Sequence, residues 1–406
     1  MTAMIRRLAA VDALRGAVMI VMALDHVRDF IHRGAMSGSP TDLATTTPML
    51  FMTRWVTHFC APVFMMTAGL GAYFYLSRRS PGEGGSAGAR TKGQLSRFLI
   101  IRGLWLIVLE LTLMQFAYNF NLAPTNPIFM LVLYVLGACM IILAALVWLP
   151  MNVLAAVSIA IVLLHNSLDG IRAQSLGSFA PMWILLHQVG AIPFAGRIFI
   201  APYSLIPWFA VMALGFCLGP LFAKDPERRR QHLMRVGVMM TIAFVIVRAI
   251  NIYGDPSRWS SQPSMAMTLV SFLNTTKYPP SLLFLLMTLG PALICLSRFD
   301  RITFARSNPL IVFGRVPLFY FVAHFFAAHA AIVLLSLMTY GGRAMEFMWQ
   351  PVPSMGGPAK AFPPDFGYPL WVAYAVWLTI VVALYPLCRW FAGVKEGSRS
   401  RWLSYL

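Results

Sequence analysis

Charged residues are scarce in this chain of 406 residues. Asp, Glu, Lys and Arg together make up 11% of it, against about 25% in soluble domains. Hydrophobic residues make up 59%, and the mean hydropathy is +0.70. So little charge excludes an ordinary soluble domain. Because the apolar runs are continuous, they favour membrane-spanning helices over a β-barrel, whose strands alternate. We therefore expect an all-α, polytopic membrane bundle in which residues 1–406 form a single domain.

Acidic residues are the scarcer charged class, with 14 Asp and Glu against 32 Lys and Arg. The basic residues gather in a few short loops, which is the positive-inside pattern of membrane proteins. A nucleic-acid-binding protein would instead show a basic face with interleaved aromatic residues. We therefore expect a lipid bilayer and no nucleic acid as a partner. Both termini are predicted to be cytoplasmic, in a bacterial-type inner (plasma) membrane.

Cysteine pairs with a recognisable spacing are missing. The five cysteines are scattered through separate apolar segments, at positions 60, 139, 217, 295 and 388. An odd and scattered set predicts neither a disulfide framework nor a zinc site. We expect these residues to act as small buried hydrophobic side chains, and we expect no metal.

Long hydrophobic runs are abundant, and about ten of them are long enough to be membrane spans. They cover Val11–Ile31, Met49–Leu76, Phe98–Tyr118, Ile128–Leu149, Val153–His165, Ser204–Phe222, Leu233–Asn251, Ser281–Leu296, Leu310–Met338 and Leu370–Ala392. A further apolar segment, Met182–Ile200, contains Gly190 and Pro193. Because these residues interrupt helices, we expect a re-entrant or interfacial piece there.

The first span carries six ionisable residues in an apolar sequence. They are Asp12, Arg15, Asp25, His26, Arg28 and Asp29. Arg15 and His26 are eleven steps apart, so they share one helix face about 16 Å apart along the axis. Ionisable groups at membrane depth normally face a bundle interior or a wet cavity. A buried Asp25–Arg28 ion pair with a helix-end histidine also fits this pattern, but six such residues on one span favour a functional role.

Two further spans place ionisable residues at membrane depth. Arg54 and His58 are four residues apart, so they face the same way, and Pro62 predicts a kink beside His58. These features fit either a polar site or a packing kink with an interfacial arginine. Glu110 has no sequence neighbour to pair with, and we expect a structural ion pair with another helix, for instance through Arg248.

The later part of the chain adds four candidate residues. Lys277 and Tyr278 precede the eighth span at its outer mouth, although Lys277 also fits a snorkelling interfacial lysine. Arg315 and His324 lie within the ninth span. A histidine and an arginine inside a span again indicate a polar cavity.

Four segments, in order along nearly the whole chain, resemble the catalytic domain of heparan-α-glucosaminide N-acetyltransferase and its bacterial relatives, within the transmembrane acyltransferases. They are R-L-A-A-V-D-A-L-R-G-A-V-M-I-V-M, the second-span stretch from Pro62 to Gly69, T-K-Y-P-P-S-L with Lys277, and G-R-V-P-L-F-Y-F-V-A-H ending at His324. The Arg15–His26 spacing also resembles the signature helix of acyltransferases that modify bacterial surface glycans.

The resemblance implies transfer of an acyl group, acetyl above all, from cytoplasmic acyl-CoA to an extracytoplasmic or lipid-linked acceptor such as a sugar. A general base near neutral pKa must then take the proton of the attacking group. His26, held by Asp29 or Asp25, is the first candidate. The resemblance also implies a catalytic histidine in the following loop, where His32 stands, so the base remains open between His26 and His32.

Further roles follow from the same expectation. Arg15, Arg102 and Arg315 are candidates for binding the CoA phosphates, because guanidinium matches phosphate geometry. His58, Lys277 or His324 are candidates for polarising the thioester or positioning the acceptor, with Tyr278 beside them. An acyl-histidine intermediate stays open. A homodimer is a further candidate assembly.

Two other function classes remain. A proton-coupled small-molecule transporter would use His26, Glu110 and His324 as a relay. Such transporters usually show two related halves, and none is visible in this sequence. A polyprenyl-phosphate sugar transferase would use Asp25 or Asp29 as its base, but Asp42 alone stands in the first outer loop, where metal-binding acidic residues would be expected.

Overall fold

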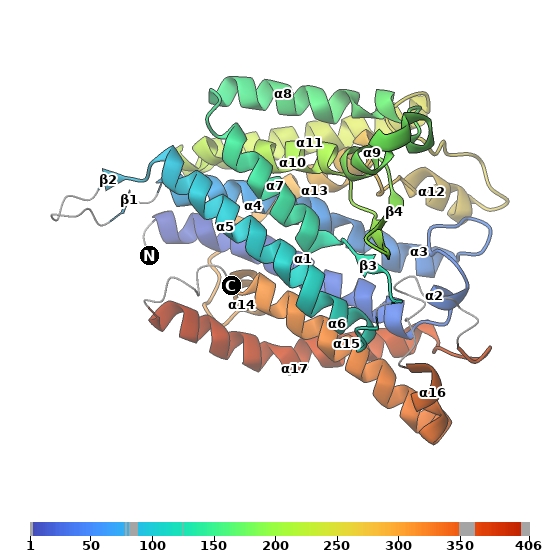
Figure 1. Cartoon of the computed structure of the whole chain (residues 1–406). Coiled ribbons are helices and arrows are strands. Elements are labelled where there is room, and N and C mark those ends of the chain that lie inside the picture. The colour runs from blue at the N-terminus through green and yellow to red at the C-terminus, as the bar shows by residue number, and fades with distance from the viewer. Residues whose placement is uncertain (1–2, 78, 81–87, 124, 349–361, 399–406) are drawn as a thin grey trace.

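The computed structural model describes most of the chain, namely residues 3–77, 79–80, 88–123, 125–348 and 362–398 (Figure 1). The sequence S-P-G-E-G-G-S-A-G-A at Ser80–Ala89 predicts a flexible linker, and it lies largely outside these residues. Helices dominate the described part. The short helices outside the membrane spans are α2 (Gly34–Ser37), η4 (Ala173–Phe179), α9 (Ala180–Leu186) and α12 (Met265–Leu273).

Eight helical stretches of the described chain are long and apolar enough to cross a membrane. They comprise α3 (Pro48–Trp55) with η1 (Val56–Phe59) and α4 (Cys60–Ser77), α5 (Lys92–Leu109) with η2 (Glu110–Met114) and α6 (Gln115–Asn119), α8 (Met151–Leu164) with η3 (His165–Leu168), α10 (Leu205–Cys217) with η5 (Gly219–Ala223), α11 (Pro226–Ile250), α13 (Leu282–Phe299), α15 (Pro317–Tyr340) with η6 (Gly341–Arg343) and α16 (Ala344–Met348), and α17 (Leu370–Gly397). The polytopic all-α fold is thus confirmed.

Two more helices lie at predicted spans but are not among these eight. They are α1 (Ala3–Ile31), which carries more charge than the eight, and α7 (Val132–Leu146), which is shorter. A helix with several ionisable residues is stable at membrane depth only when other helices surround it. Figure 1 shows α1 in the middle of the bundle, and it packs against α4, α13, α14 (Pro309–Arg315), α15 and α17.

Close backbone approach holds α1 against α14. A Cβ atom at Gly16 would lie 1.8 Å from the backbone oxygen of Leu310, and one at Gly314 would lie 1.8 Å from that of Asp12. Only glycine fits at these two positions. Small residues at helix contacts are the usual means of close packing in membranes, where burial of apolar surface gives little driving force.

Helix α1 begins and helix α17 ends toward the same end of the bundle in Figure 1. Side chains from both ends of the chain meet there, because Arg315 pairs with Glu396 near the end of α17. We call this the basic end, since it carries Arg15, Arg90, Arg97, Arg102, Arg315 and Lys395 around one cavity. The opposite end carries α2, α3, α12 and a small sheet.

The interrupted segment 182–200 forms a β-hairpin after α9. Strands β4 (Gly190–Phe194) and β5 (Arg197–Ala201) pair antiparallel, and β3 (Ile128–Phe129) adds to β5 in parallel. The turn has positive φ angles at Ala195 and Gly196, as two-residue hairpin turns require. The strand order is β3–β5–β4. A second, two-stranded ribbon pairs β1 (Arg79–Ser80) with β2 (Gly88–Ala89).

The prediction that Glu110 forms an ion pair with another helix, for instance through Arg248, is wrong. Its carboxylate accepts hydrogen bonds from the Tyr118 hydroxyl at 2.6 Å and from the backbone amides of Leu133 and Tyr134. Glu110 therefore caps the first turn of α7, where backbone amides lack helical partners. Arg248 instead donates to the backbone carbonyls of Ser257, Ser271, Phe272 and Asn274.

Candidate active site

A large cavity opens at the basic end and has a volume of about 1000 Å³. Its polar rim is the set of basic residues named above, and its interior is apolar. Met19, Leu106, Leu133 and Phe321 line the interior and are each at most 4% exposed. We call it the basic cavity. Its size lies at the upper end of the range for ligand sites, about 300–1000 Å³.

A smaller and more polar cavity lies at the other end of the bundle. Its volume is about 410 Å³, and it is lined by Arg28, Asp29, Ser39, Pro40, Thr41, Arg54, His58, Ser257, Asn274, Thr275, Thr276, Lys277 and Tyr278. We call it the polar cavity. The break predicted beside Pro62 is present as the 3₁₀ turn η1, which places buried His58 at this cavity. The Nδ1 atom of His58 has no hydrogen-bond partner among the described residues.

The two cavities use the same helices at different depths. On α1, the basic cavity reaches Met19 and the polar cavity begins at Arg28, about 14 Å further along the axis. On the second span, His58 lines the polar cavity and Phe64 lines the basic cavity. His26 occupies the α1 segment between them. The two cavities open at opposite ends of the bundle.

His26 is bound by a second histidine in this intermediate layer. Its Nδ1 atom lies 2.6 Å from Nε2 of His324, and Nδ1 of His324 lies 2.9 Å from the backbone oxygen of Tyr320. Because a carbonyl only accepts, Nδ1 of His324 carries the hydrogen, and the neutral ring then accepts at Nε2. His26 therefore donates from Nδ1 and keeps its lone pair on Nε2. This is the tautomer that a general base needs.

The expectation that Asp29 or Asp25 holds His26 is wrong, because both carboxylates pair with arginines instead. Arg28 binds Asp29 at 2.5 Å and Asp25 at 2.9 Å, and Arg54 also pairs with Asp25. Opposite charges attract strongly in a low-dielectric interior, so the carboxylates go to arginines rather than to a neutral imidazole. The Asp25–Arg28 pair considered from the sequence is present, and it is extended by Arg54.

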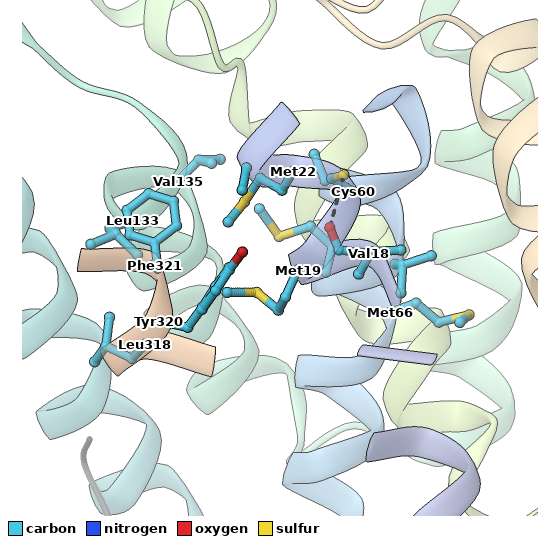
Figure 2. Packing of buried hydrophobic residues seen from close by; sticks show 14 of the residues in the cluster. Val18, Met19, Met22, Cys60, Met66, Leu133, Val135, Leu318, Tyr320 and Phe321 are labelled. Atoms are coloured by element: carbon cyan, nitrogen blue, oxygen red, sulfur yellow. Dashed lines mark hydrogen bonds between the residues drawn. The ribbon is translucent and has the colours of Figure 1, made fainter. Parts of the chain in front are cut away.

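Tyr320 is a candidate that sequence reasoning missed. Its side chain is fully buried, and its hydroxyl has no hydrogen-bond partner in the described part of the chain. Figure 2 shows this hydroxyl directed toward Met19 and Met22 of α1. The residue lies between Leu318 of the basic cavity and His324, with its ring 5.3 Å from the His324 ring. A tyrosine in an apolar run reads as a packing residue, so its sequence carries no signal of this position.

The structure brings most predicted site residues to the two cavities. Arg15, Arg102 and Arg315 all line the basic cavity, whereas Asp29, His58, Lys277 and Tyr278 all line the polar cavity. Burial opposes ionisation of the Tyr278 phenol, but the charges of Lys277 and Arg54 outweigh it and lower the pKa of Tyr278 below its ordinary value.

His32 stands apart from this arrangement. Its Nδ1 atom accepts a hydrogen bond from the backbone amide of Gly34 at 3.0 Å. Burial, and after it the charges of Arg28 and Arg33, lower the pKa of His32 below its ordinary value. His32 is therefore engaged in the turn after α1, whereas His26 lies between the cavities.

The three residues of the expected proton relay, His26, Glu110 and His324, do not form one connected chain of hydrogen bonds. The two histidines are hydrogen-bonded to each other, but Glu110 is bonded to Tyr118 and to the start of α7. Between these groups lie aromatic contacts: the Phe325 ring stacks on His26 with ring centroids 4.1 Å apart and meets Tyr118 edge-on at 5.1 Å. Ring contacts of this kind do not carry protons.

Comparison with known proteins identifies one related family. A family model described as heparan-alpha-glucosaminide N-acetyltransferase, catalytic, matches residues 7–254, which is more than half of the chain. The matched segment contains Arg15, His26, His58 and Arg102. A search of curated proteins finds no match.

Proposed function

The chain belongs to the heparan-alpha-glucosaminide N-acetyltransferase catalytic family, a family of transmembrane acetyltransferases, and from this premise we propose that it moves an acyl group across a membrane. The donor is acyl-CoA, acetyl-CoA above all, bound in the basic cavity. The acceptor is an extracytoplasmic or lipid-linked sugar bound in the polar cavity. We place the basic end in the cytoplasm of a bacterial-type inner membrane and treat residues 1–406 as one domain.

One observation carries the proposal: the His26–His324 pair lies between two cavities that open at opposite ends of the bundle. A transferase whose donor and acceptor are on different sides of a membrane needs a site that each can reach from its own side. A pore would join the cavities, whereas here the two histidines lie between them.

The composition of the basic cavity suits the donor. CoA carries phosphates at one end and a thin, uncharged arm ending in the thioester at the other. The cationic rim matches the phosphates, and the apolar interior leads from Arg15 past Met19 toward His26. The thioester carbonyl would then lie beside Tyr320.

The residues at this layer can carry the transfer. Nε2 of His26 takes the proton of the attacking hydroxyl or amine. At the same time, a lone pair on the attacking oxygen or nitrogen bonds to the thioester carbon. The buried hydroxyl of Tyr320 donates to the carbonyl oxygen while negative charge builds on it. The C–S bond then breaks, and His26 returns the proton to the leaving CoA sulfur. His324 keeps His26 in the required tautomer.

The proposal is tested with purified protein and acetyl-CoA, by following the free thiol of released CoA with a thiol reagent. We expect saturable release that is raised by a sugar acceptor. Tyr320→Phe should lower kcat by about 10²-fold, as loss of one oxyanion donor does in other acyl transfers. Because the Tyr320 hydroxyl lacks a hydrogen-bond partner among the described residues, its removal should leave the melting temperature unchanged or raised.

Tyr385→Phe is the matched control. Tyr385 donates to the backbone oxygen of Ser307, away from both cavities, so its variant should retain turnover. Absence of acetyl-CoA binding and of CoA release would overturn the proposed function. Full turnover in Tyr320→Phe would remove Tyr320 from the mechanism.

A further inference from the structure

The polar cavity has one positive charge more than its carboxylates balance. Arg28, Arg54 and Lys277 face two carboxylates, those of Asp25 and Asp29, and the arginines bind both of these. Within the described residues, Lys277 has no carboxylate within 4 Å, and its ammonium lies 5.0 Å from the centre of the Tyr278 ring. Lys277 also interacts with the Tyr278 phenol, and its charge is the one that no carboxylate of the described residues balances.

Two further charged residues, Asp255 and Arg248, lie behind the residues that line the polar cavity, and they do not change its charge balance. Asp255 accepts four hydrogen bonds, from the backbone amides of Ser257 and Thr276 and from the hydroxyls of Thr276 and Ser281. Buried Arg248 donates to backbone carbonyls of the same wall, including that of Ser257. The two opposite charges lie on the same side of the cavity, and Asp255 fixes the loop that carries Lys277.

The rest of the lining suits a ligand with many hydroxyl groups. Hydroxyls of Ser39, Thr41, Thr275, Thr276 and Tyr278 and the amide of Asn274 surround the cavity. His58 adds a buried Nδ1 atom, with the side chain 1% exposed and no partner for this atom among the described residues. An unpaired polar atom at this depth costs free energy unless a ligand or water satisfies it.

We propose that the polar cavity binds an acceptor that is rich in hydroxyl groups and carries a negative charge, and that the acylated group is a hydroxyl. This inference rests on the proposed function and narrows its acceptor. An amino sugar is largely protonated near neutral pH. Its ammonium would meet Lys277, and it would find both carboxylates already bound to arginine. A carboxylate or phosphate on the sugar would instead pair with Lys277.

The chemical step balances with these partners. The acceptor oxygen forms a C–O bond to the thioester carbon, and the C–S bond breaks. The hydroxyl proton passes to Nε2 of His26 and then to the sulfur of CoA. The products are an O-acyl sugar and CoA, and no further reactant is needed.

The test compares four probes in direct binding to the purified full-length protein, without acyl-CoA, and then in acetyl transfer with it. The probes are glucuronate, glucose 6-phosphate, neutral glucose and glucosamine. The first two distinguish a carboxylate from a phosphate. We expect either or both anions to bind at least about tenfold more tightly than glucose, as for a charge-assisted hydrogen bond, and glucosamine to bind most weakly.

Substitution of Lys277 assigns the preference to this cavity. In Lys277→Gln, the anion-to-glucose preference should fall by about tenfold, whereas Lys277→Arg should keep it and so control for folding. Lys224→Gln is the matched surface control, because Lys224 is exposed and lines neither cavity.

Two results overturn the inference: binding of glucosamine that equals or exceeds that of glucuronate and glucose 6-phosphate, or an anion preference that survives in Lys277→Gln. Absence of acetyl transfer to every probe would instead contradict the proposed function. The order of binding would still decide the inference in that case, because it is measured without the donor.

Discussion

His26→Ala is expected to lower CoA release from acetyl-CoA by about 10²- to 10⁴-fold, the usual contribution of a general base. The variant should still reach the membrane, because His26 is only partly buried and, within the described part of the chain, its side chain hydrogen-bonds only to His324. The reason for the loss is specific. In the proposed mechanism, His26 provides an Nε2 lone pair between the two cavities, and alanine leaves no group there to take the proton.

His32→Ala separates the two candidate bases. Because Nδ1 of His32 accepts from Gly34 in the turn after α1, we expect this variant to retain most of its turnover. His232→Ala, at an exposed position on α11, controls for expression. Normal turnover in His26→Ala, together with loss in His32→Ala, would transfer the role of base to His32.

Gly71→Phe is expected to weaken acetyl-CoA binding by at least about tenfold, because ligands need the open volume of a preformed cavity. Gly71 lines the basic cavity, and a Cβ atom there would meet nothing within 4 Å. The new ring can therefore enter the cavity without disturbing α4. Binding of radiolabelled acetyl-CoA to the purified protein measures the effect.

Gly393→Phe provides the matched control for this substitution. Gly393 lies on an exposed face of α17, and a Cβ atom there also meets nothing within 4 Å. This variant carries the same added ring but should keep wild-type affinity. If Gly71→Phe binds acetyl-CoA as tightly as Gly393→Phe does, the basic cavity is not the donor site.

The sequence predicts the depth of ionisable residues well. Hydropathy fixes where each helix crosses the membrane, and the basic loops indicate one common side, so Arg15, Arg102 and Arg315 are expected at similar depth. The structure places all three around one cavity. Lys277 and Tyr278 follow the same logic at the other end, since they directly precede a span.

Pairing between helices was predicted much less well. Asp25 and Asp29 bind arginines rather than His26, and Glu110 caps α7 rather than pairing with Arg248. Spans that are apolar on most faces show little periodicity, so one sequence does not reveal which helices are neighbours. The His26–His324 bond joins residues 298 positions apart, and only the packing of α1 on α15 reveals it.

The central claim is that donor and acceptor meet at His26 from opposite cavities. A structure of the protein with a non-hydrolysable acetyl-CoA analogue tests it most directly. We predict CoA phosphates beside Arg15, Arg102 and Arg315, and the analogue's carbonyl close to the Tyr320 hydroxyl. Its carbon should lie where an acceptor atom held by His26 can approach to about 3–3.5 Å. Density for the analogue in the polar cavity, or a carbonyl that stays at the basic rim, would contradict the account.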